Sequence, residues 1–94
     1  MNNKEFIAAM KEELDEQHLK IVLKALQGVK AAPSKSDRAP KDFCETIGPV
    51  FFEEEVAAEG KLRLLVALVV HFVPIAHRIS VQELINQRLQ GQNS

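Results

Sequence analysis

The chain has 94 residues, which is enough for one hydrophobic core but not for two. Its 12 basic and 13 acidic residues give a net charge of −1, without the basic excess that is typical of nucleic-acid-binding proteins. The single cysteine, Cys44, excludes an internal disulfide bond. The longest apolar run, Leu64 to Val70, is far shorter than the roughly 20 residues that cross a membrane. We therefore expect one globular domain over residues 1–94, stabilised by packing and with no membrane partner.

Two helices are predicted in the first third of the chain. The apolar residues of the first recur at spacings of three and four, and they are Phe6, Ile7, Met10 and Leu14. Asn3 is expected to cap its start. The second helix is predicted to follow a capping residue, Asp15, and to end near Gly28. Its apolar stripe consists of Leu19, Val22, Leu23 and Leu26.

A polar stretch at residues 31–40 is predicted to be a solvated loop, more plausibly a spacer than a recognition loop, because it has no large apolar side chain to bury. A third helix is predicted to follow, with Pro40 in its first turn and Asp42 near its N-terminus. Its apolar face consists of Phe43, Ile47, Val50 and Phe51. Pro49 removes a backbone hydrogen bond, so the helix is expected to kink or restart there.

The most apolar segment, about residues 57–72, is long enough to favour a helix over a strand, and the chain has no second strand candidate to pair with it. Because it is apolar on nearly all sides, we expect it to be the central helix, with Leu65, Leu68 and Phe72 buried. Pro74 is expected to begin a turn. A last helix is predicted from the capping box Ser80–Glu83, followed by a frayed tail at 90–94. The predicted fold is an all-α bundle of about five helices.

No catalytic, cofactor or metal site is predicted. The three histidines, His18, His71 and His77, lack the close spacing of metal ligands. Cys44 has acidic neighbours, which disfavour a reactive thiolate. We therefore expect a protein that is not an enzyme. A cluster of acids is either a solubilising face or a rim that attracts a basic partner, and its members are Glu53, Glu54, Glu55 and Glu59.

The predicted function is the binding of a partner helix in a groove between two helices, although the apolar residues could equally all be closed into the core. One wall of the groove would be formed by Leu19, Leu23 and Leu26, and the other by Phe6 and Met10. Lys20 and Lys24 would meet acidic residues that flank the apolar stripe of the partner. We expect a monomer.

The rival function is direct nucleic-acid binding through dispersed basic residues. These residues are Lys20, Lys24, Lys30, Lys35, Arg38 and Lys41. Phosphate contacts by such side chains would make the affinity for DNA strongly dependent on salt concentration. Because the overall charge shows no basic excess, nucleic acid is not expected to be the main ligand.

The segments KALQGVK (24–30), DFCETIGPVF (42–51) and LLVALVVHFVP (64–74) resemble the harmonin-homology domain, in the version carried by telomere-elongation helicases. The most specific matches are residues 47–51 and 72–74. Val29 stands where that family often has tyrosine, the loop at 31–40 is longer, and the basic run after residue 73 is thinner. The segment HFVPIAHRI also resembles the end of the paired amphipathic helix domain of Sin3-type co-repressors.

The resemblance implies a helical hub that is not itself an enzyme. It would be part of a larger nuclear DNA helicase involved in DNA repair and telomere maintenance, and it would bind short amphipathic helices of replication or repair proteins. The co-repressor resemblance implies the same mode of binding within a different parent protein.

Overall fold

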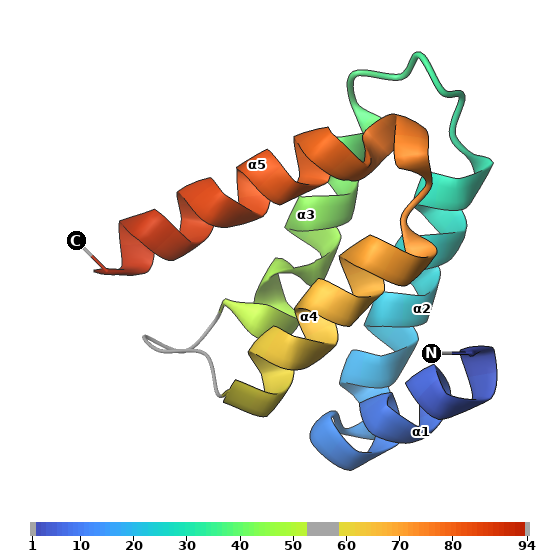
Figure 1. Cartoon of the computed structure of the whole chain (residues 1–94), viewed down its shortest axis with the longest axis vertical. Helices are drawn as coiled ribbons and strands as arrows, with labels where there is room; N and C mark the ends of the chain where they lie inside the picture. Colours follow the sequence, from blue (N-terminus) through green and yellow to red (C-terminus); the bar gives the residue numbers. More distant parts are fainter. Residues whose placement is uncertain (1, 53–58, 94) are drawn as a thin grey trace.

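Figure 1 shows the computed structural model of the chain, which describes residues 2–52 and 59–93. This part contains five helices and no strand: α1 (Asn3–Glu13), α2 (Glu16–Ala31), α3 (Ala39–Phe51), α4 (Glu59–Phe72) and α5 (Ile75–Asn93). The predicted all-α bundle of about five helices is thus confirmed. None of the helices described is both long enough and apolar enough to cross a membrane.

Side-chain caps fix the starts of α1 and α2. The Asn2 side chain accepts a hydrogen bond from the Glu5 backbone N–H at 2.8 Å, so the cap lies one residue before the predicted Asn3. Asp15 caps α2 as predicted, accepting from the His18 N–H at 2.8 Å. The predicted end at Gly28 is wrong. The helix continues to Ala31, because Val29 beyond the glycine is buried in the core.

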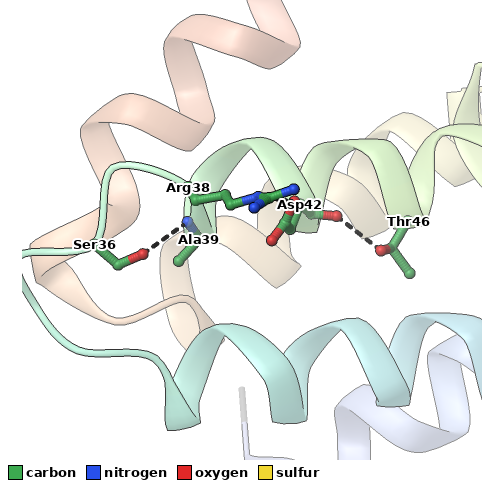
Figure 2. Close-up of polar contacts among 5 residues, drawn as sticks. All are labelled: Ser36, Arg38, Ala39, Asp42 and Thr46. Carbon is green, nitrogen blue, oxygen red and sulfur yellow. Dashed lines mark hydrogen bonds and ion pairs between the residues drawn. The ribbon is translucent and has the colours of Figure 1, made fainter.

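The loop between α2 and α3 covers residues 32–38 and is shorter than the predicted 31–40. Its Ser36 hydroxyl accepts a hydrogen bond from the Ala39 N–H at 3.1 Å, at the first turn of α3 (Figure 2). Along the same helix, Arg38 lies 3.7 Å from the Asp42 carboxylate, and the Thr46 hydroxyl donates to the Asp42 carbonyl at 2.7 Å. These contacts organise the beginning of α3.

Replacing Ser36 with alanine should destabilise the fold by about 0.5–1.5 kcal/mol, because the Ala39 N–H would lose its partner at a helix start. Urea denaturation would measure this loss. Ser34→Ala is the matched control, since that serine is exposed in the same loop and its loss should change stability by less than about 0.5 kcal/mol. Equal stabilities of the two variants would show that Ser36 does not hold the helix start.

The proline within α3 does not interrupt it. Pro40 lies in the first turn as predicted, and the helix runs without a restart through Pro49 to Phe51. The ring of Pro49 is exposed, whereas Val50 and Phe51 beside it are each only 2% exposed. Burial of these two neighbours keeps the last turn helical although Pro49 donates no backbone hydrogen bond.

The central helix is α3, not α4 as predicted. α3 packs along α2 on one side and against α5 on another, and it also contacts α4. In α4, Leu65 and Leu68 are buried as predicted, but Val66 is 62% exposed. α4 contacts α1, α3 and α5, but the side that carries Val66 remains in solvent. An evenly apolar sequence shows that a helix has no polar face, but it does not determine which other helices pack against that helix.

α5 begins directly after Pro74, not at Ser80. His77 and Val81 are 2% and 0% exposed, so the first turns of α5 pack in the core and are helical for that reason. Ser80 is exposed in the middle of the helix, and the predicted capping box is not a helix start. The predicted frayed tail, residues 90–94, is helical as far as Asn93.

Candidate functional site

An apolar groove of about 220 Å³ lies between α1 and α2, next to the end of α4. We call it the α1/α2 groove. The side chains that shape it are Phe6, Ile7, Leu23, Leu26, Lys30 and Phe72. Large apolar side chains that remain partly in solvent form its two edges: Ile7 on α1 is 38% exposed and Leu23 on α2 is 36% exposed. Such edges leave apolar surface for a partner to cover.

The floor of the groove is apolar and well packed. Phe6 and Leu26 are 2% and 6% exposed, and the ring centroids of Phe6 and Phe72 lie 4.3 Å apart. Phe72 is only half-buried, contrary to the prediction, because one side of its ring packs on Phe6 while another faces the groove. The Lys30 ammonium lies 5.7 Å from the centre of the Phe72 ring, within range of a cation–π contact. The positive charge of Lys30 therefore lies beside the apolar floor of the groove.

The structure brings together three of the five apolar residues that were predicted to form a groove. Phe6, Leu23 and Leu26 line it. Met10 is fully buried in the core, and Leu19 packs partly buried against the core outside the groove. Met10 therefore lies too deep to meet a partner in this groove, and Leu19 lies too far along α2.

The lysines that were predicted to flank the groove lie elsewhere. Lys20 lies 3.8 Å from Glu16 on the exposed side of α2. Lys24 lines a different groove, between α2 and α3, because the residue that follows Leu23 is turned about 100° around the helix. Lys30, which was predicted only as a possible nucleic-acid contact, is the lysine at this groove. The spacing from Leu23 to Lys30 is seven residues, which places both on one helical face and could have identified it.

The groove between α2 and α3 is larger, about 730 Å³, and chemically mixed. Its floor includes the small residues Ala25 and Gly28, and a Cβ atom added to Gly28 would have no heavy atom within 4 Å. Its walls carry charges of both signs, among them Lys24, Arg38 and Asp42. The pairing of Arg38 with Asp42 partly neutralises this wall, so the groove has neither a continuous apolar floor nor one dominant charge.

The described residues hold no group of three or more potential metal ligands. His77 is 2% exposed, and its Nε2 atom has no hydrogen-bond partner among the residues that the structure describes. Burial raises the pKa of the Cys44 thiol to about 11, and the nearby Arg88 offsets this only in part. A thiol with this pKa is a poor nucleophile at neutral pH. The acidic cluster Glu53–Glu55 lies outside the described residues, as does the Glu59 side chain.

Comparison with known proteins identifies no relative. No protein-family model matches the chain, and it has no match among curated proteins or solved structures.

Proposed function

We propose that this chain is a non-catalytic protein–protein interaction domain, and that its α1/α2 groove binds a short amphipathic helix of a partner. The observation that carries this proposal is the pair of exposed side chains Ile7 and Leu23 above a buried apolar floor. A groove between two helices accepts an apolar stripe with side chains at i, i+3, i+4 and i+7. Two or three large side chains of the partner would provide most of the affinity.

The charge at the groove favours a partner with acidic residues beside its apolar stripe. Lys30 is the only charged side chain among the described residues that line the groove, and the polar ones are Asn3 and Gln27. A carboxylate on the partner would meet Lys30 at the edge of the groove. Such a contact at an exposed edge would contribute less than about 1 kcal/mol and would mainly accelerate association.

The resemblance to the harmonin-homology domain supports a further part of the proposal, which concerns the parent protein. We propose that the domain belongs to a nuclear DNA helicase and binds replication or repair proteins there. Most of the apolar residues that carry the resemblance lie in the core, since Ile47, Val50 and Phe51 are core residues and Val73 is 1% exposed, whereas Phe72 lines the α1/α2 groove. Their burial is compatible with a helical hub whose partner would be selected at the α1/α2 groove. A co-repressor hub domain would use the same groove with a different partner.

Lys30→Glu should weaken the binding of an acidic amphipathic peptide roughly 3- to 10-fold at low salt, because an attraction becomes a repulsion. The probe is a synthetic peptide of about four helical turns with leucines at i, i+3, i+4 and i+7 and glutamates on both flanks. Isothermal titration would give the affinity. The matched control is Lys24→Glu, which makes the same change of charge on the same helix but in the other groove.

Equal effects of the two substitutions would contradict binding in the α1/α2 groove. Amide chemical shifts locate the peptide independently, and the largest changes should fall at Ile7, Leu23 and Gln27, which border the groove. A duplex DNA oligonucleotide is the second probe. If DNA binds more tightly than the peptide, with an affinity that falls steeply with salt, the chain is a nucleic-acid-binding module and not a protein hub.

A further inference from the structure

α5 has apolar side chains on two opposite sides, and only one side packs in the core. Val81 and Ile85 face the core and are 0% and 7% exposed. Ile75 and Ile79 lie on the other side and are 79% and 70% exposed. These two are the most exposed large apolar side chains in the described part of the chain. Large apolar side chains gathered in solvent on one helix face indicate an interaction surface.

The side of α5 that carries Ile75 and Ile79 has the spacing of a coiled-coil seam, and its last member, Leu89, is partly buried against the core. Successive members are four, three, four and three residues apart: Ile75, Ile79, Gln82, Asn86 and Leu89. All lie on one face because α5 is continuous from Ile75 to Asn93. We call these five residues the α5 seam. None of them is charged, and two carry amide side chains that both donate and accept hydrogen bonds.

α4 provides a second apolar wall beside the α5 seam. A groove of about 280 Å³ runs between the two helices, and Val66, Val69 and Val70 line it on the α4 side. Val66 is 62% and Val70 41% exposed. No charged residue is among the described residues that line this groove. A helix placed here would contact α4 through valines and α5 through Gln82, Asn86 and Leu89, and the seam continues beyond the groove to Ile79 and Ile75.

We propose that the α5 seam of a second copy of this chain occupies this groove, so that the protein forms a two-fold symmetric dimer. In such an interface the same surface patch is used by both copies, so charges of one sign would repel each other. The uncharged seam meets this condition, whereas the α1/α2 groove, with Lys30 at its edge, suits a different partner.

The amides of the seam provide a second argument for a second copy as the occupant. Two parallel α5 helices would place Asn86 opposite Asn86, and two antiparallel helices would place Asn86 opposite Gln82. In both alignments each amide meets an amide with which it can form hydrogen bonds. Polar residues such as asparagine within a seam are a known means of fixing the register and the number of helices, and this seam carries two, Gln82 and Asn86. This proposal replaces the monomer expected from the sequence, and it depends on α5 beginning at Ile75 and not at the predicted Ser80.

Sedimentation equilibrium on the whole chain, from about 1 µM to 1 mM, tests the proposal. The wild type should pass from monomer to dimer with a Kd of about 1–100 µM, as for a small interface. Ile79→Glu should raise this Kd at least about tenfold, because in either alignment a carboxylate would be buried in the seam without a partner. Ile79 is 70% exposed, so circular dichroism should show an intact fold. The matched control, Ala8→Glu, is on the exposed side of α1 and outside both grooves, and it should leave the Kd unchanged.

Asn86→Leu gives a test in the opposite direction. It should tighten the dimer, because an asparagine in a seam fixes register at a cost in stability. A wild type that stays monomeric at 1 mM overturns the proposal, even if an uncharged helical peptide binds to the seam. Association of Ile79→Glu as strong as that of the wild type also overturns it. Dimerisation and peptide binding involve different faces, so either proposal can fail without the other.

Discussion

Truncation of Phe51 to alanine should reduce the free energy of unfolding by about 3–5 kcal/mol. Phe51, at the end of α3, is only 2% exposed and is the largest fully buried side chain in the described part of the chain, so its removal leaves a cavity in the core. A domain of this size has a total stability of about 5–15 kcal/mol, so the loss is a large fraction of it. The melting temperature should fall by roughly 15–30 °C, as measured by circular dichroism.

Two further variants serve as controls for Phe51→Ala. Lys41→Ala, on the exposed side of the same helix, should change the stability by less than about 0.5 kcal/mol. Phe72→Ala should cost less than Phe51→Ala, because the Phe72 ring is only half-buried at the groove. If Phe72→Ala proved the more costly of the two, the core would be centred on α4, as the sequence predicted, and not on α3.

The Cys44 thiol should react with iodoacetamide at pH 8 roughly 100-fold more slowly than an ordinary cysteine. Cys44 is 8% exposed, and burial raises the pKa of its thiol to about 11, with a smaller opposing effect of Arg88. The thiolate is the reacting species, and its fraction falls about tenfold for each unit by which the pKa exceeds the pH. The rate should therefore rise about tenfold for each pH unit up to pH 11. Rapid modification of the folded protein at pH 8 would contradict this environment.

The same raised pKa predicts a loss of stability in alkali. Above about pH 9 the thiol of the unfolded chain ionises while that of the folded chain keeps its proton, so the folded state binds more protons and becomes less stable as the pH rises. The loss between pH 9 and 11 should be about 2 kcal/mol. Lysines also titrate in this range, so the comparison is with Cys44→Ala, which should lack this part of the pH dependence.

Local signals in the sequence determined the class of fold and most of the elements. Asp15 caps α2 and Pro40 lies in the first turn of α3, because both effects depend only on residues within one turn of the helix. The spacing of apolar residues also identified Phe6, Leu23 and Leu26, which meet in one groove. Periodicity reports which residues share a face, and this is enough to select candidates for a wall.

Tertiary packing decided where helices end and which faces stay exposed. Gly28 and Ser80 are reasonable local boundaries, yet the helices continue through both. Val29 is buried directly after Gly28, and His77 and Val81 are buried on either side of Ser80. Burial of an apolar side chain contributes more free energy than a glycine inside a helix costs. It also outweighs the stabilisation that a cap at Ser80 would provide.

The sequence by itself thus determined that the chain is an all-α bundle and which residues could form apolar faces. Only the tertiary structure decided that α3 is central, that Lys30 and not Lys24 borders the α1/α2 groove, and that Ile75 and Ile79 remain in solvent. The physical reason is that helix periodicity depends on neighbours within about one turn, whereas coverage depends on which other helix lies against a face. That choice depends on contacts between residues far apart in the chain.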